Sequence, residues 1–147
     1  MNKAIRTFLL VLMFFICKNI GYAQTANLDS VKVEFAGFGI ETFFAVNCED
    51  FDTEFKQEMA VKTFYIQDDL SKFFALIKQF KPQTKQSLDV RGSIIYYYKR
   101  KSIKYCFDVF GNFYKDGQLF YNNELLIYVT DKLDRRHPKY LDTLRQQ

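Results

Sequence analysis

Residues 88–121 alternate between runs rich in aromatic and β-branched residues and short turn signals, and this pattern constrains the fold more than any other feature. The turn signals are a charged turn around Arg100, then Gly111-Asn112 and Asp116-Gly117. Asp-Gly is among the strongest short hairpin signals. The runs between these signals predict an antiparallel meander with strands over residues 88–98, 102–110, 113–115 and 118–121.

The main predicted helix lies before this meander. Its apolar residues recur at helical spacing and fall on one face: Leu70, Phe73, Phe74, Ile77 and Phe80. Asp68 and Asp69 are both suitable N-caps, and Pro82 ends the pattern, so we expect a helix over residues 69–80 and a polar linker over 81–86. The other expected elements are strands over 31–35, 40–48 and 61–66, a short helix or irregular crossover over 49–58, a helix after Asn122 or Asn123, and a last short helix from Pro138.

These elements predict an α+β fold. We expect a largely antiparallel sheet of about five to seven strands, with the main helix and the C-terminal helix packed on one face. The order of elements resembles the helix-on-sheet rolls of the cystatin and nuclear-transport-factor types. That resemblance implies a fold and transfers no functional site.

The turn positions also predict a register, and register assigns each side chain to a face. Two-residue turns at Arg100-Lys101, Gly111-Asn112 and Asp116-Gly117 place Tyr96 opposite Tyr105, and Tyr114 opposite Leu119. The predicted core face carries Ile94, Tyr96, Tyr98, Ile103, Tyr105, Phe107, Val109, Tyr114 and Leu119. The other face carries Arg91, Ser93, Ile95, Tyr97, Lys104, Cys106, Asp108, Phe110, Phe113, Lys115 and Phe120.

Residues 1–23 have the features of a cleaved secretory signal peptide. Lys3 and Arg6 precede an apolar run over residues 7–17, and Gly21 and Ala23 provide the small residues of a cleavage site. The apolar run is about half the length that spans a membrane, so no stable anchor is expected after cleavage. Cys17 follows the large residue Ile16, which argues against lipidation. We therefore expect an exported protein, periplasmic or extracellular, with residues 24–147 forming a single small domain.

Cleavage of the signal peptide would change the net charge of the chain. The remaining chain has 18 basic and 17 acidic side chains, so its net charge gives no reason to expect binding to nucleic acid. The charges are nevertheless uneven, because residues 24–80 carry 10 acids and 5 bases whereas residues 81–147 carry 7 acids and 13 bases. We expect these two halves to pair with each other rather than with a partner.

Two cysteines, Cys48 and Cys106, remain after the predicted cleavage. In an oxidising compartment they are expected to form a disulfide. Such a bond would add about 4 kcal/mol in the chain-entropy view. The alternatives are two buried thiols or a nucleophilic cysteine. The chain's single histidine, His137, lies in a basic C-terminal run and is a poor candidate for an orienting base.

Most motifs that carry chemistry are missing from the sequence. One histidine is too few for a zinc site, and no phosphate-binding glycine loop occurs. Asp50, Asp52 and Glu54 have the spacing that begins a calcium loop, but Phe55 and Val61 stand where the loop requires Gly and Glu. The sequence therefore predicts no catalytic residue, no metal site and no cofactor.

The candidate binding residues lie on the meander. They are Arg91, Tyr97, Lys99, Arg100, Lys101, Lys104 and Asp108. The basic cluster at the first turn is suited to anionic polymers, although charges at a hairpin tip also discourage edge-to-edge pairing. Adjacent strand residues alternate faces, so Tyr97 is expected to point outward while Tyr96 and Tyr98 point into the core.

The sequence favours a non-enzymatic exported module that binds another protein or a component of the cell envelope. An inhibitor or an immunity-type protein is one form of it. The aromatic content of 18%, with 17 Phe, 10 Tyr and no Trp, is sufficient for a core built from rings. The composition also resembles that of small exported proteins of Gram-negative bacteria with AT-rich genomes. The alternatives are a small hydrolase that uses carboxylates, or Asp108 with Lys104 or Lys115, and a binder of anionic polymers through the basic hairpin.

Overall fold

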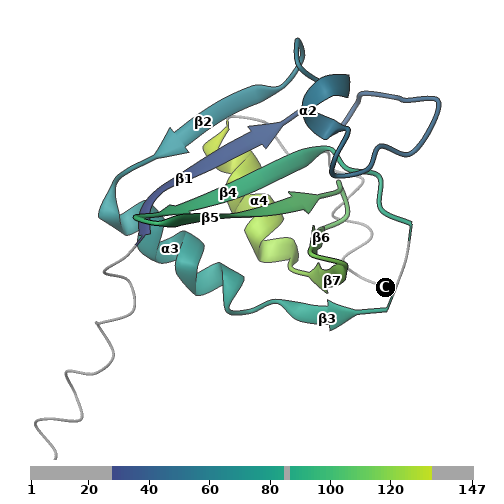
Figure 1. Ribbon diagram of the computed structural model, residues 1–147. Coiled ribbons are helices and arrows are strands. Elements are labelled where there is room, and N and C mark those ends of the chain that lie inside the picture. Colours follow the sequence, from purple (N-terminus) through teal and green to yellow (C-terminus); the bar gives the residue numbers. More distant parts are fainter. Residues whose placement is uncertain (1–27, 85–86, 134–147) are drawn as a thin grey trace, which may run out of the picture.

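A single antiparallel sheet organises the computed structural model, which describes residues 28–84 and 87–133 (Figure 1). The predicted signal peptide, His137 and the predicted helix from Pro138 lie outside these residues. Seven strands form the sheet in the order β2-β1-β4-β5-β6-β7-β3. Its strands are β1 (Leu28–Phe35), β2 (Ala60–Phe64), β3 (Lys81–Gln83), β4 (Gly92–Tyr98), β5 (Lys101–Phe107), β6 (Asn112–Lys115) and β7 (Gln118–Tyr121).

Two helices, α3 (Gln67–Ile77) and α4 (Asn123–Lys132), pack on one face of the sheet. The helices bury Leu70, Phe73, Leu76, Leu125, Leu126 and Val129 against it. The α+β class, the strand number and the packing of these two helices on one face are therefore confirmed. We call this the inner face of the sheet.

The inner face explains the use of many aromatic residues. The ring centroid of Phe80 lies 5.3 Å from that of Tyr105, 5.1 Å from that of Phe113 and 5.2 Å from that of Phe120. The Phe73 ring likewise contacts the rings of neighbouring elements. Such pairs add roughly 0.5–1.5 kcal/mol each beyond the area they bury.

The predicted register is correct at the β6–β7 hairpin. At the β4–β5 hairpin the register differs from the prediction, but the side chains keep their predicted faces. Asp116 and Gly117 form the β6–β7 turn with φ of 49° and 81°, the left-handed pair of a type I′ turn. Between β4 and β5 the turn lies one residue earlier than expected, because Tyr98 pairs with Lys101. This changes the opposite partners by two residues, so each side chain keeps its predicted face.

The predicted turn at Gly111-Asn112 is wrong. Phe107 pairs with Phe113, and a four-residue loop, residues 108–111, connects the end of β5 at Phe107 to the start of β6 at Asn112. The shift exchanges the two faces of the hairpin. Phe113 and Phe120 therefore pack in the core, whereas Tyr114 lies with Cys106 on the outer face, which is the face opposite α3 and α4. The cause is Asp108, whose carboxylate accepts hydrogen bonds from the backbone N–H groups of Phe110 and Asn112, at 2.8 and 2.9 Å.

Two other segments differ from their predictions. Residues 40–48 form no strand, and β1, which precedes them, is paired on both sides, with β2 and with β4. Part of the predicted linker 81–86 is β3, which pairs with β7 at the sheet edge, where Pro82 is tolerated. The helix α3 begins at Gln67 rather than Asp69, so Asp68 and Asp69 lie in its first turn and not at its N-cap.

The oppositely charged halves do pair with each other. Lys104 contacts Asp52 at 2.9 Å, and Lys132 contacts Asp69 at 2.5 Å. Each of these ion pairs joins the acidic first half of the chain to the basic second half. The uneven charge distribution therefore contributes, in part, to contacts inside the fold.

Candidate functional site

Residues 36–59, which we call the anchored segment, connect β1 to β2 and cover one end of the outer face of the sheet (Figure 1). The segment contains the short helix α2 (Phe51–Glu54). A second hydrophobic cluster forms beneath it from Ala36, Val46, Phe51, Phe55, Val90 and Cys106. The cluster arises because the apolar residues of the segment find partners on the face that α3 and α4 leave open.

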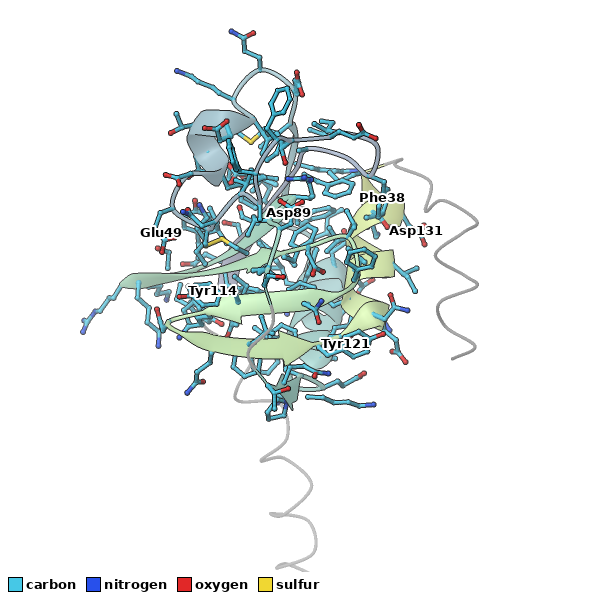
Figure 2. The ribbon with its side chains drawn as sticks, turned by 90° about the vertical axis from the view of Figure 1, so that its right-hand side faces the viewer. Phe38, Glu49, Asp89, Tyr114, Tyr121 and Asp131 are labelled. Atoms are coloured by element: carbon cyan, nitrogen blue, oxygen red, sulfur yellow. A yellow bond between two sulfur atoms is a disulfide. The ribbon has the colours of Figure 1, made fainter. Side chains whose placement is uncertain are left out.

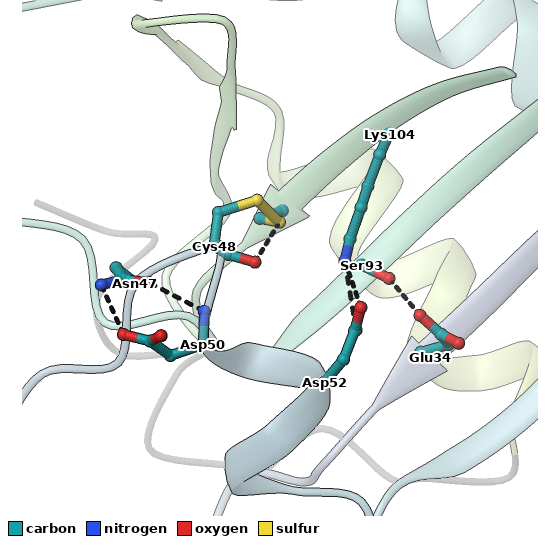
Figure 3. Close-up of a disulfide and its surroundings, with 8 residues drawn as sticks. Glu34, Asn47, Cys48, Asp50, Asp52, Ser93 and Lys104 are labelled. Atoms are coloured by element: carbon teal, nitrogen blue, oxygen red, sulfur yellow. Dashed lines mark hydrogen bonds and ion pairs between the residues drawn. A yellow bond between two sulfur atoms is a disulfide. The ribbon is translucent and has the colours of Figure 1, made fainter.

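A disulfide and main-chain bonds hold the anchored segment to the sheet. Cys48 and Cys106 form the disulfide, with Cα atoms 5.7 Å apart (Figure 3). The Val46 N–H donates to Asp89 Oδ1 at 2.9 Å, and the Val90 N–H donates to the Val46 carbonyl at 2.8 Å. In Figure 2 Asp89 lies beneath this segment. A disulfide is compatible with an oxidising, exported compartment.

Arg91 supports the same segment from below. Its side chain is buried, and Nη2 donates to Thr42 Oγ1 at 2.8 Å and to Asp89 Oδ2 at 2.6 Å. The guanidinium carbon also lies 5.2 Å from the ring centroid of Phe55. The guanidinium of Arg91 therefore donates to the anchored segment and to residues next to Arg91. Although the sequence predicted Arg91 as a ligand-binding residue, its contacts hold the anchored segment in place.

The charges under the segment are paired within the fold (Figure 3). Ser93 Oγ donates to the buried Glu34 carboxylate at 2.6 Å, and Lys32 Nζ contacts Glu34 at 2.5 Å. The hydrogen bond with Glu34 is the main reason that the pKa of Lys32 lies above its usual value. Lys104 is occupied in the same way by Asp52. These contacts stabilise the covered face.

The anchored segment exposes two adjacent rings, Phe43 and Phe44. Their relative exposures are 101% and 85%, although the segment on either side is held down. A groove of about 360 Å³ runs beside them, and its lining includes Glu41, Asp50 and Glu54. The Asp50 carboxylate accepts a hydrogen bond from Asn47 Nδ2 at 2.7 Å, which orders this acidic rim. The result is an aromatic tip with a negatively charged border, the acidic–aromatic tip.

The remaining predicted binding residues do not join this tip. Tyr97, Lys99, Arg100 and Lys101 lie together at the β4–β5 turn, at the other end of β4 from Gly92. Lys101 Nζ lies 5.6 Å from the ring centroid of Tyr98. Exposure separates this group from Arg91 and Asp108, because Tyr97 and the three cations are exposed whereas the other two are buried.

Asp108, proposed above as a hydrolytic carboxylate, has a structural environment. Besides its two main-chain bonds it accepts a bond from Asn112 Nδ2 at 2.7 Å. Burial raises the pKa of Asp108, and the hydrogen bonds from Asn112, Phe110 and Gly111 oppose that rise. Its partner in the hydrolase hypothesis, Lys115, is paired with Asp116. The carboxylate therefore organises the β5–β6 loop.

A second groove, of about 630 Å³, lies along the β6–β7 hairpin, which carries Tyr114 and Tyr121 in Figure 2. Its described lining is Pro82, Gln83, Leu88, Tyr114, Gly117, Gln118, Leu119 and Phe120. These residues include no carboxylate and no amine, so the lining offers no acid–base pair. Across residues 28–84 and 87–133, no group of three or more His, Cys, Asp or Glu side chains is placed to hold a metal ion.

Sequence reasoning missed Phe43 and Phe44 as functional candidates because it assigned them to a strand. One signal was available. Since strand side chains alternate, only one of two adjacent Phe residues can face a core, and the flanking Gly39 and Asn47 interrupt the run.

No family model matches the chain, and neither a curated protein nor a solved structure matches it. No helix in the described part of the chain is long and apolar enough to cross a membrane.

Proposed function

We propose that this protein is an exported, non-enzymatic binding module that recognises another protein through the acidic–aromatic tip. The observation that supports the proposal most is the exposure of Phe43 and Phe44 on a segment held by a disulfide. Burying a Phe side chain contributes about 1.5–3 kcal/mol, and a loop that is already ordered loses little conformational entropy when it binds. An inhibitor or an immunity-type protein would use such a tip.

The chemistry of the tip specifies the partner. Two adjacent rings require an apolar pocket, and the bordering Glu41, Asp50 and Glu54 favour basic side chains around that pocket. The same carboxylates would be repelled by an anionic lipid surface, which makes a membrane a poor alternative. The partner is therefore a protein with an apolar cleft and a basic rim.

A capture experiment with matched variants tests this proposal. Immobilised wild-type protein, Phe43→Ser/Phe44→Ser and Ile66→Ser are each exposed to cell-envelope extract. Ile66 is also a large exposed side chain, at 69%, but it lies at the N-cap of α3, away from the anchored segment. A protein retained by the wild type and by Ile66→Ser, but not by the double variant, is the expected result.

The retained protein is then purified and its affinity measured directly. The double variant should bind about 100-fold more weakly or worse, equivalent to two rings at about 1.5 kcal/mol each. Added salt should weaken wild-type binding, since the rims carry opposite charges. Equal retention by the double variant, or an affinity unchanged by salt, would contradict the proposed recognition mode.

A further inference from the structure

A second surface lies on the outer face of the sheet, at the end opposite the anchored segment. Figure 1 places the β4–β5 turn near the start of β1, far from α2. Tyr97 pairs with Ser30 of β1 on one side and with Ser102 of β5 on the other, so these three side chains form a row across the sheet. Tyr65 directly follows Phe64, the last paired residue of β2, whose partner in β1 is Val31, so Tyr65 lies next to the Ser30 end of this row.

The two tyrosines of this row are exposed and separate. Tyr65 is 71% exposed and Tyr97 is 37% exposed. Because one strand, β1, lies between β2 and β4, the backbones that carry the two tyrosines are about 10 Å apart across the sheet. Ser30 lies between the rings, so they form two separate stacking platforms rather than one continuous apolar patch.

Cations border the row on the side of the β4–β5 turn. Lys99 and Arg100 form the turn and are exposed, and within the described residues neither takes part in an ion pair. One carboxylate, Asp29, lies at the neighbouring bulge of β1. This end of the sheet therefore carries a small excess of positive charge, whereas the anchored segment carries the opposite sign.

We propose that this basic–aromatic face, defined by Tyr65, Tyr97, Ser30, Ser102, Lys99 and Arg100, binds an anionic glycan. Sugar rings present apolar C–H faces that stack on tyrosine, and two tyrosines that project from backbones about 10 Å apart can contact two sugar units of one chain. The serine hydroxyls supply donors and acceptors for sugar hydroxyls, and the cations pair with uronate or sulfate groups.

Other ligands fit this surface less well. A protein interface requires a continuous apolar centre, and the polar row divides the two rings. Nucleic acid is bound through many phosphate contacts, and two cations beside one carboxylate provide few. A glycan needs the separated rings, the hydroxyls and the modest charge together.

The test uses polygalacturonate as the probe, with neutral dextran and an oligothymidylate for comparison. Wild-type protein should bind polygalacturonate and bind dextran and the oligonucleotide at least about tenfold more weakly. Lys99→Ala/Arg100→Ala should weaken polygalacturonate binding and flatten its dependence on salt. Lys72→Ala, an exposed cation on α3 and so on the opposite side of the sheet, is the control and should bind like the wild type.

The aromatic contribution is tested separately. Tyr97→Val removes the ring but keeps a residue suited to a strand, and Tyr65→Ser lies outside any strand. Each should reduce polygalacturonate affinity about tenfold, the scale of one stacked ring. Phe43→Ser/Phe44→Ser should leave that affinity unchanged, which separates this proposal from the protein-binding tip.

Several outcomes would overturn the inference. Absence of polygalacturonate binding by the wild type is one. Equal binding of the oligothymidylate, or unchanged polygalacturonate affinity in both tyrosine variants, would show that the surface attracts any polyanion and has no preference for a glycan. A loss with Lys72→Ala as large as with Lys99→Ala/Arg100→Ala would show that the position of the charges does not matter.

Discussion

Asn122 Nδ2 donates a hydrogen bond of 2.7 Å to the main-chain carbonyl of Leu76, in the last turn of α3. The same side chain caps α4, because Asn122 Oδ1 accepts from the Leu125 N–H at 2.9 Å. One buried amide therefore serves the end of one helix and the start of the next. It fixes the relative position of the two helices that cover the inner face.

Replacing this amide should be costly. Asn122→Ala loses an N-cap, worth about 1 kcal/mol, and a buried hydrogen bond of about the same value, so we expect about 2 kcal/mol less stability. Asn122→Ser keeps a capping oxygen and should lose about half as much. Urea unfolding followed by circular dichroism measures both, and equal stability of the two variants would contradict the dual role.

The elements that the sequence predicted correctly are those whose signals are local. The helix α4 follows a capping Asn, and the β6–β7 turn is an Asp-Gly pair, so a few adjacent residues determine each structure. The Gly111-Asn112 signal failed for a non-local reason. Asp108 captures the loop backbone through its own carboxylate, and this outcompetes the two-residue turn.

The candidate site was less predictable. Phe43 and Phe44 belong to a run with strand-like composition, but β1, the strand that precedes the run, is already paired on both sides. Its two partners are β2 and β4, which lie far apart in sequence. By contrast, the exposure of Tyr97 followed from alternation alone, because the shift of the β4–β5 turn preserved every face.

Tyr96 is a fully buried side chain whose hydroxyl has no hydrogen-bond partner among the described residues. Burial raises its pKa well above the usual value. Because an unsatisfied hydroxyl costs about 1–3 kcal/mol, Tyr96→Phe should be at least as stable as the wild type and gain up to about 2 kcal/mol. Thermal unfolding measures this. A loss above about 1 kcal/mol would show that the hydroxyl is satisfied.

Asp69 joins α3 to α4 through two donors. Lys132 Nζ lies 2.5 Å from the Asp69 carboxylate, and Tyr128 Oη lies 2.8 Å from it. Both hydrogen bonds lower the pKa of Asp69 below its usual value of 3.8, and the bond from Lys132 has the larger effect. A lowered acid pKa stabilises the fold above about pH 4, and the contribution is lost as pH falls through the depressed pKa.

Asp69→Asn should therefore be about 1 kcal/mol less stable than the wild type at neutral pH, since the Lys132 amine is partly exposed and the bond is screened. The difference should shrink below about pH 3. Asp68→Asn, an exposed neighbour in the same turn, is the control for the effect of helix-end charge. A pH-independent difference would argue against the lowered pKa.

Removing the disulfide should affect the anchored segment more than the sheet. The bond closes a loop with a sequence separation of 58, so Cys48→Ala/Cys106→Ala should lose about 4 kcal/mol at most. Hydrogen exchange should quicken in residues 36–59 first, while strands packed against α3 and α4 stay protected. Native protein whose two thiols both react with an alkylating reagent before reduction would refute the bond.

The acidic–aromatic tip can be followed directly, because the chain contains no Trp. Phe43→Trp creates a single indole at a position of 101% exposure, so its emission should match that of free indole in water and its stability should stay within about 0.5 kcal/mol of the wild type. Tyr65→Trp places the same reporter on the basic–aromatic face, where exposure is also high.

The two reporters should respond to different ligands. The captured partner protein should shift the Phe43→Trp emission to shorter wavelength and leave Tyr65→Trp unchanged, because only the tip would enter an apolar pocket. Polygalacturonate should do the reverse, since the two surfaces lie at opposite ends of the sheet. Emission of a buried indole from free Phe43→Trp protein would contradict an exposed tip, and a response of both reporters to one ligand would contradict two separate surfaces.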